Sequence, residues 1–319
     1  MAKSTEAQDR RSSMVIVLAG AVLIVLAGCA AVPGAPESLE ANGAADFGHT
    51  HGLGADPTTG ETYAATHNGV WLVPTGQLPE DYLDGAERDS GVNRVQIAGR
   101  AQDTMGFTVA APGLLLASGH PDPVEQPDLN PPNLGLISST DGAKTWGTLS
   151  LRGETDFHDL DAVTLPDGAL RIYGYDATGG MIQVSDDDGA TWTARASIQL
   201  RDLAADRANP DRLYATTADG LLVSNDTGRS FEPVSAAPAL FLIAAGDAES
   251  GNMVGIDTQG AIWSTSIEAG TWSMTGQTEG TPEALGYVVG STPWILIADA
   301  RGIVASDDLG ATGTVLVPK

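Results

Sequence analysis

The sequence predicts an all-β protein, a β-propeller with six blades of four antiparallel strands each. Three observations lead to this prediction. A short box of residues recurs along the chain, each box follows a glycine and a short apolar segment, and two further short apolar segments precede that glycine. Six such units of about 40 to 55 residues fill residues 47 to 318, a repeat length typical of propeller blades. A ring of seven blades is the alternative.

The recurring box has the pattern Ser-x-Asp-x-Gly-x-Thr/Ser-aromatic. Its copies are SSTDGAKTW, SDDDGATW, SNDTGRSF and SDDLGATG, with key aspartates at Asp141, Asp187, Asp226 and Asp308. The first copy carries its glycine one position early, and the last copy lacks the aromatic residue. The last interval of 82 residues is about twice the earlier ones of 46 and 39. A degenerate copy is therefore expected halfway along it, where STSIEAGTW occupies residues 264–272.

The strands of each unit follow from the short apolar segments around the box. NGVWLVP (68–74), GGMIQVS (179–185) and DGLLVS (219–224) each predict a strand after a glycine turn. Two further strands are expected upstream of that glycine, as in LRDLAADRANPDRLYATTADG (200–220). Each unit therefore supplies all four strands of its own blade.

The boxes resemble the Asp-box (BNR) repeats of sialidase-like, sortilin-like and photosystem-assembly propellers, over nearly all of the chain after residue 46. The resemblance implies that each box is a turn between the third and fourth strands. Its carboxylate is expected to accept backbone N–H bonds, and its aromatic residue to pack between blades. It implies a structural role for Asp187 and Asp226. The whole chain resembles an actinobacterial type of lipoprotein commonly labelled a BNR-repeat or sialidase-like glycosyl hydrolase.

The N-terminal residues predict export and a lipid anchor. Residues 1–28 contain the apolar run MVIVLAGAVLIVLAG after two arginines, which is typical of a signal peptide. The run ends in Leu26-Ala27-Gly28-Cys29, which resembles a bacterial lipobox, and Cys29 is the only cysteine of the chain. The resemblance implies a lipidated Cys29 and a protein held at the extracytoplasmic face of the cell membrane. Residues 30–46 are small, polar and rich in Pro and Gly, and are expected to form a flexible tether to the propeller at 47–319.

Charge and missing motifs narrow the classes of function. The chain carries a formal net charge of −25, which repels nucleic acid and anionic lipid head groups. We expect no nucleic-acid partner. Neither a Gly-x-Ser-x-Gly elbow nor a phosphate-binding glycine loop is present, so the sequence gives no support to nucleophilic hydrolysis of the serine type.

Aligning the first strand of each unit produces two polar columns, two residues apart. The outer column reads His49, Asp103, Asp156, Gln199, Ala239 and Glu283, and the inner column reads His51, Met105, His158, Arg201, Phe241 and Leu285. Side chains two residues apart on a strand point to the same side. We expect the two columns to meet at the channel mouth, where the innermost strands of a propeller begin.

The two remaining histidines are expected at the same face. His67 and His120 both follow the second strand of their unit, and Asp176 is assigned the equivalent place in unit three. The proline-rich insert PDPVEQPDLNPPN (121–133) follows His120 and is expected to form a rim or lid. All five histidines are therefore predicted near blades one to three.

A metal site is the first functional hypothesis for this ring. Neutral imidazoles with a thioether and nearby carboxylates suit copper, or zinc if Met105 is not a ligand. The candidate metal ligands are His49, His51, Met105, His158, His67 and His120, with Arg201 and Asp176 as candidates for contacts with a bound small ligand.

Two other classes of function remain open. Glycoside hydrolysis needs a pair of carboxylates, for which Asp103, Asp156 and Glu283 are the candidates. The sialidase pattern is incomplete, since no Arg-Ile-Pro motif is present and Arg201 is the only arginine in the two columns. A non-catalytic scaffold that presents the channel mouth to an envelope protein is the third hypothesis.

Overall fold

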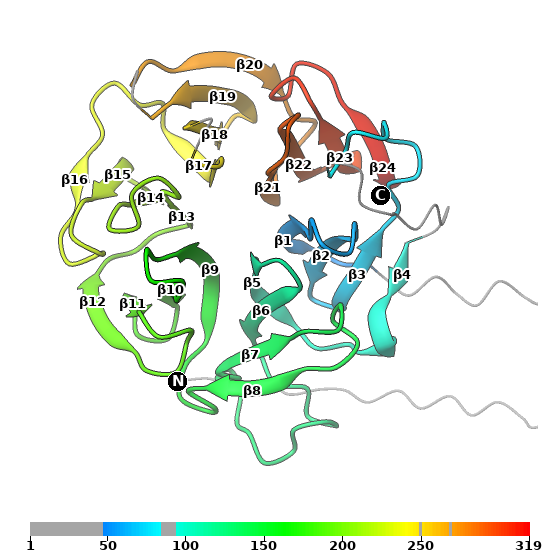
Figure 1. Ribbon diagram of the computed structural model, residues 1–319, viewed down its shortest axis with the longest axis vertical. Coiled ribbons are helices and arrows are strands. Elements are labelled where there is room, and N and C mark those ends of the chain that lie inside the picture. The colour runs from blue at the N-terminus through cyan, green and yellow to red at the C-terminus, as the bar shows by residue number, and fades with distance from the viewer. Residues whose placement is uncertain (1–46, 84–93, 249–250, 268–269) are drawn as a thin grey trace, which may run out of the picture. The chain divides into compact units, whose positions relative to one another are not determined.

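Six four-stranded antiparallel sheets are arranged around a central axis in the computed structural model (Figure 1), which describes residues 47–83, 94–248, 251–267 and 270–319. Each sheet consists of four strands that are consecutive in the sequence. The prediction of an all-β propeller with six blades is confirmed. The expected signal peptide, Cys29 and the expected tether lie outside the described residues. Among those residues, no helix has the length and apolar character needed to cross a membrane.

The chain forms each blade from its innermost strand outward. The strands of blades one to three are β1 (Thr50–Ala55), β2 (Thr62–Thr66), β3 (Gly69–Val73), β4 (Val95–Gln96), β5 (Thr104–Ala111), β6 (Leu114–Gly119), β7 (Leu136–Ser139), β8 (Gly147–Ser150), β9 (Phe157–Thr164), β10 (Leu170–Asp176), β11 (Met181–Ser185) and β12 (Thr193–Ser197). The strands of blades four to six are β13 (Asp202–Ala205), β14 (Leu213–Thr217), β15 (Gly220–Ser224), β16 (Glu232–Pro233), β17 (Leu240–Ala245), β18 (Asn252–Asp257), β19 (Ala261–Ser266), β20 (Ser273–Gln277), β21 (Ala284–Val288), β22 (Trp294–Asp299), β23 (Gly302–Ser306) and β24 (Thr314–Pro318). One short 3-10 helix, Ile97–Gly99, follows β4.

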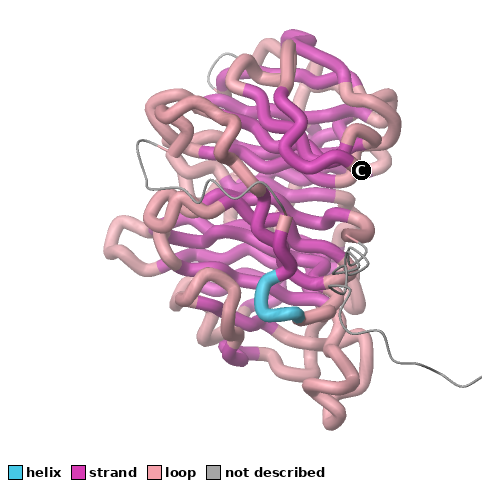
Figure 2. The backbone as a smooth tube through the Cα atoms, turned by 90° about the vertical axis from the view of Figure 1, so that its right-hand side faces the viewer, coloured by secondary structure: helices cyan, strands magenta, loops and turns pink. Residues whose placement is uncertain are grey.

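The hydrophobic core lies between neighbouring blades. Six clusters of buried apolar side chains each join two adjacent blades, including the cluster that joins blade six to blade one. Tyr63 of blade one and Leu115 of blade two, for example, are almost completely buried in one cluster. The sheets therefore pack face to face around the ring, which Figure 2 shows from its edge.

The recurring boxes form tight turns between the third and fourth strands of their blades. In blade three, Asp187 accepts hydrogen bonds from Ser185 Oγ at 2.8 Å, from Thr191 N at 2.8 Å and from Thr191 Oγ1 at 2.6 Å. These bonds, with the Thr191 hydroxyl foremost, lower the pKa of Asp187 to about 2. The same pattern of bonds occurs in the other three boxes, at Asp141, Asp226 and Asp308. Part of the degenerate copy, residues 268–269, lies outside the described residues.

The ring closes by packing β21 of blade six against β1 of blade one, without any exchange of strands. Gly286 makes this approach possible, because a Cβ at that position would lie 2.6 Å from the carbonyl oxygen of Leu53. A hydrogen bond of 3.0 Å from Thr50 N to Glu283 Oε2 adds a polar contact across the junction.

Innermost strands β1, β5, β9 and β17 each carry a β-bulge. The ladder of β1 pairs Thr50 with Thr66 and Gly52 with Ala65, which leaves His51 as the extra residue. Near the starts of these four strands the extra residues are His51, Met105, His158 and Phe241, four members of the inner column. Bulges change the direction of a side chain and are common beside functional sites.

Candidate functional site

Seven side chains form a connected set at one end of the ring, which we call the rim cluster. Its members are His49, His51, His67, Asp103, His120, Asp156 and His158. They come from the starts of the innermost strands of blades one to three and from the turns after β2 and β6. Because the repeats are arranged alike around the ring, these strand starts and turns lie at the same end of the channel.

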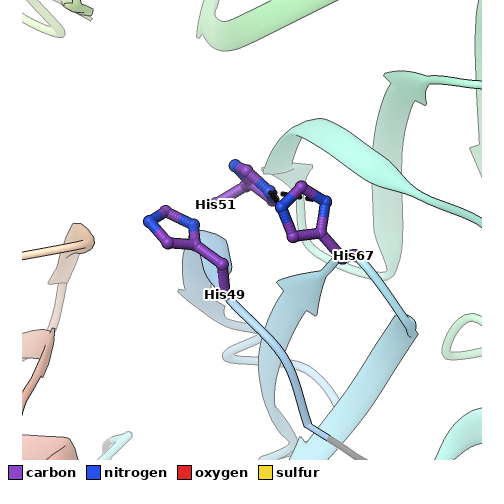
Figure 3. Close-up of side chains that lie close together, drawn as sticks. All are labelled: His49, His51 and His67. Carbon is purple, nitrogen blue, oxygen red and sulfur yellow. Dashed lines mark hydrogen bonds between the residues drawn. The ribbon is translucent and has the colours of Figure 1, made fainter. Parts of the chain in front are cut away.

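Three imidazoles of blade one form the first triad: His49, His51 and His67 (Figure 3). The Nε2 atoms of His51 and His67 lie 3.4 Å apart, and the ring centroids of His49 and His51 are 4.7 Å apart. A backbone hydrogen bond from His67 N to His49 O, 3.2 Å long, fixes the turn after β2 against the start of β1. One nitrogen from each ring lies within 4.8 Å of the other two.

The surroundings of the first triad favour neutral imidazoles. Burial, together with the neighbouring rings of His67 and His49, lowers the pKa of His51 to about 3. Burial also lowers the pKa of His49, against the opposing effect of Glu283. A neutral imidazole has a free lone pair, which is the form that binds metal ions.

Asp103 of blade two connects the first triad to the rest of the rim cluster. Its Oδ1 lies 2.8 Å from Nδ1 of His67, and its Oδ2 lies 2.7 Å from Nδ1 of His120. If each Nδ1 carries the shared proton, both Nε2 atoms keep their lone pairs. A carboxylate that holds the far nitrogen of a histidine in this way is the usual support for a metal ligand.

The second triad consists of His120, Asp156 and His158. Oδ2 of Asp156 lies 2.9 Å from Nε2 of His158 and 3.3 Å from Nε2 of His120. Asp156 is almost fully buried, whereas about a third of each histidine side chain is exposed. All five histidines of the chain therefore belong to two adjoining triads that meet at Asp103.

The other residues predicted from the two columns have different surroundings. Met105 is the half-buried bulge residue of β5, two residues beyond Asp103. Arg201 stacks over the ring of Phe241 at 4.8 Å and donates a hydrogen bond of 3.1 Å to the carbonyl oxygen of Glu283. The Glu283 carboxylate is held by Thr50 N and by the ammonium group of Lys319.

Asp176 lies one residue before the place that the alignment assigned to it. The amide of Ala177 donates to Asp156 O at 3.0 Å, as His67 and His120 donate to the equivalent carbonyls in blades one and two. The Asp176 carboxylate instead accepts bonds from Thr178 N in the turn and from Gln183 Nε2 on β11. It is therefore used in shaping the turn between β10 and β11.

The insert 121–133 is attached to the side of the ring. Ion pairs join Glu125 to Arg100 and Asp128 to Arg152. In Figure 1 this segment, after β6, projects beyond the outer edge of blade two, away from the centre of the ring. The expectation of a lid over the channel is not met in this conformation.

Two carboxylates that were not predicted from the sequence lie inside the channel, which encloses about 250 Å³ and is lined by the innermost strands. Asp159 Oδ2 accepts a hydrogen bond of 2.6 Å from Leu203 N, and Asp202 Oδ2 accepts one of 2.7 Å from Ile243 N. Each carboxylate thus joins its own innermost strand to that of the next blade. Burial, followed by the charge of Asp202, raises the pKa of Asp159 well above its usual value.

A signal for these carboxylates was present in the aligned strands. The column after the inner one reads Gly52, Gly106, Asp159, Asp202, Leu242 and Gly286. At Gly106 and Gly286 the neighbouring backbone approaches so closely that a Cβ would lie 2.7 Å and 2.6 Å from a carbonyl oxygen. Blades three and four hold the neighbouring strand through a carboxylate instead.

Comparisons with known proteins identify the fold only. No protein-family model and no curated protein sequence matches the chain. Similar solved structures include a chain from a nidogen/laminin complex, with 12% identity and a TM-score of 0.57, over 80% of this chain and 91% of that one. An ancestral GH74 enzyme is 14% identical with a TM-score of 0.50, over 81% of this chain and 36% of its own. The GH74 xyloglucanase from Xanthomonas campestris is 18% identical with a TM-score of 0.50, over 85% of this chain and 45% of its own.

The chain spans less than half the length of these two GH74 enzymes. At such identities the likeness shows a shared β-propeller fold, and propellers of one fold have many unrelated activities. The rim cluster is therefore the basis for inferring function.

Proposed function

We propose that this protein binds a transition-metal ion at the channel mouth through His49, His51 and His67, with copper as the preferred ion and zinc as the second. The observation that carries the proposal is the convergence of three imidazoles on one point, with one nitrogen of each within 4.8 Å of the others. Imidazole nitrogen is a good ligand for both metals.

The spacing within the first triad supports this assignment. Nitrogen ligands at 2.0–2.1 Å from a tetrahedral zinc ion lie about 3.3 Å from one another. The 3.4 Å between the Nε2 atoms of His51 and His67 is close to that value, and the ring centroid of His49 lies 4.7 Å from that of His51. Three protein ligands leave one position open for water or an external ligand.

Electrostatics also favour a cation here. The low pKa of His51 keeps its ring neutral over the whole ordinary pH range, so one ring nitrogen keeps its lone pair for a metal ion. Asp103 supports His67 from the far side of the ring. The surplus of carboxylates over the whole chain, which gives the net charge of −25, attracts cations to the surface.

Copper is placed first because divalent copper exceeds zinc in affinity for a given set of nitrogen ligands. The lipobox at Cys29 supports a location at the extracytoplasmic face of the membrane, where the anchored propeller would meet metal ions outside the cytoplasm.

Glycoside hydrolysis is supported less well. Asp103 is engaged by two histidines, Asp156 by two histidines, and Glu283 by Lys319 and by the backbone of Thr50. A glycosidase needs two carboxyl groups that face a sugar between them. No contact or surface among the described residues favours the scaffold hypothesis over metal binding.

Titration calorimetry tests the proposal directly. The full chain, purified in detergent without a histidine tag, is titrated with Cu²⁺ and then with Zn²⁺. Substitution of a residue that only supports a metal ligand weakens binding by about 10–100-fold. His51→Ala removes a ligand, so it is expected to weaken binding at the first triad by more than that. Gln199→Ala serves as the control, because Gln199 belongs to the outer column, as His49 does, but offers no imidazole.

The control is expected to bind as the wild-type chain does. Absence of copper and zinc binding by the wild-type chain would refute the proposal. Equal affinities of the wild-type chain and His51→Ala would also refute it, because a site without His51 is not the first triad.

A further inference from the structure

His120 lies between two carboxylates, one at each nitrogen of its ring. Asp103 Oδ2 is 2.7 Å from Nδ1, and Asp156 Oδ2 is 3.3 Å from Nε2. A neutral imidazole carries only one N–H, so it can satisfy only one of the two carboxylates. The other nitrogen would present its lone pair to a negative oxygen unless a cation lies between them. That cation is either a second ring proton or a metal ion.

Asp156 shows a further unmet requirement. Only 4% of its side chain is exposed, and its Oδ1 accepts no hydrogen bond from any residue that the structure describes. A buried carboxylate oxygen without a partner is costly, and metal coordination is one of the usual ways in which buried charges are compensated. The unpartnered oxygen belongs to the same carboxylate that both histidines contact.

The three donor atoms have the spacing of metal ligands. Nε2 of His158 and Nε2 of His120 lie 2.9 Å and 3.3 Å from Oδ2 of Asp156, and the three groups lie within 4.8 Å of one another. Ligands around a tetrahedral zinc ion are separated by about 3.3 Å. Two imidazoles and a carboxylate are a common set of three zinc ligands, with the fourth position open.

We infer that His120, Asp156 and His158 form a second metal site, for a divalent ion of the zinc class, next to the first triad. The inference rests on the proposed function only in taking the rim cluster as a metal-binding surface. The two sites differ in chemistry, because the first triad offers three imidazoles and the second replaces one of them with a carboxylate.

Asp103 makes the two sites one functional unit. It is not a ligand of either ion in this arrangement, but each of its oxygens holds the Nδ1 atom of one ligand histidine. Binding at either triad fixes one of these histidines and thereby orients Asp103 for the other. The channel mouth would then carry two ions, each with one position open for water or an external ligand.

The stoichiometry of bound zinc tests the second site. The tag-free full chain is loaded with Zn²⁺, passed over a desalting column and analysed for metal by mass spectrometry. We expect two zinc ions per chain in the wild type, one in His51→Ala, one in His158→Ala and none in the double variant. Asp156→Asn tests the second triad without removing a histidine, and is also expected to hold one ion. Gln199→Ala is expected to hold two.

The outcomes separate this inference from the proposed function. No zinc and no copper in the wild-type chain would overturn both. One ion in the wild-type chain, lost in His51→Ala and kept in both His158→Ala and Asp156→Asn, would overturn the second site and leave the first. One ion lost in either histidine variant would show a single composite site, which also overturns the inference. Circular dichroism of each variant confirms that the six-bladed fold is retained.

Discussion

The Oδ1 atom of Asp103 lies 2.8 Å from Nδ1 of His67, although the two residues belong to different blades. The other carboxylate oxygen of Asp103 holds His120 in the same manner. One side chain of blade two therefore sets the ring orientation of a histidine in each triad. Support of this kind fixes the tautomer and leaves the opposite nitrogen for a metal ion.

Asp103→Asn is expected to weaken metal binding at both triads by about 10–100-fold. An amide has one oxygen and one NH₂ group, so it accepts from the Nδ1–H of only one histidine, more weakly than a carboxylate does, and opposes the same tautomer in the other. Calorimetric titration of the variant with Zn²⁺ measures the loss. A loss confined to one triad would show that the other histidine is oriented independently of Asp103.

His51 is expected to make the metal-free protein less stable in acid. Its pKa of about 3 in the folded chain lies below its ordinary value of 6.5. Burial is the main cause, and the rings of His67 and His49 also lower the pKa. Arg201 lowers it as well, whereas Asp103 raises it. Between pH 6.5 and 3 the unfolded chain therefore binds a proton that the folded chain does not, and stability falls as the pH falls. The slope from this group is at most about 1.4 kcal/mol per pH unit.

Denaturant unfolding at pH 7, 6, 5 and 4 measures this contribution. The wild-type chain includes the acid response of all its carboxylates, so the informative quantity is the difference from His51→Gln. The variant should lose less stability per pH unit over this range. Parallel stability curves for the two proteins would contradict the low pKa of His51.

The blades could be predicted from the sequence because each repeat carries its own local signals. Glycine turns, short apolar strands and the boxes around Asp187 and Asp226 all depend on residues that are close together in the chain. Closure of the ring could not be predicted. It depends on Gly286 and Leu53, which are far apart in sequence and meet only when all six blades are present.

The histidines of the rim cluster were predicted from the sequence, but the physical reason for the placement of some of them differs from the expected one. Regular alternation along β1 was the basis for placing His49 and His51 on one side, but β1 begins after His49 and His51 occupies a bulge. The misplacement of Asp176 also has a local cause. The turn after β10 has four residues, 177–180, where the turn after β2 has two, 67–68. Neither the bulge nor the turn length follows from the repeat period.

Asp159→Asn is expected to stabilise the protein at neutral and alkaline pH. Burial and the charge of Asp202 raise the pKa of Asp159 above 3.8 in the folded chain. The stability that the protonated carboxyl group contributes is therefore complete below pH 3.8 and is lost as the pH rises through the folded-state pKa. An amide is never ionised, keeps an oxygen for Leu203 N and can donate to Asp202. The gain should reach about 1.4 kcal/mol for each pH unit by which the pKa of Asp159 is raised.

Stability measured between pH 4 and pH 8 decides this prediction, since the advantage of Asp159→Asn should grow with pH. Asp161→Asn is the matched control on the same strand. Its carboxylate lies 3.4 Å from the guanidinium group of Arg207 and accepts the N–H of Ala205, so loss of its charge should destabilise the protein. An advantage of Asp159→Asn that is independent of pH would contradict the proposed cause.

Glu283 is expected to stabilise the closed ring more through the backbone of blade one than through its ion pair. Its Oε2 accepts the N–H of buried Thr50 at 3.0 Å, while its partner Lys319 has an exposed side chain. Glu283→Ala leaves the N–H of Thr50 without a partner, which costs about 1–3 kcal/mol. Lys319→Ala removes only an exposed ion pair, worth about 0–1 kcal/mol.

Denaturant unfolding should therefore show that Glu283→Ala is less stable than Lys319→Ala. Glu283→Gln should have an intermediate stability, because its amide oxygen still accepts from Thr50. Equal losses in Glu283→Ala and Lys319→Ala would assign the stabilisation to the ion pair instead.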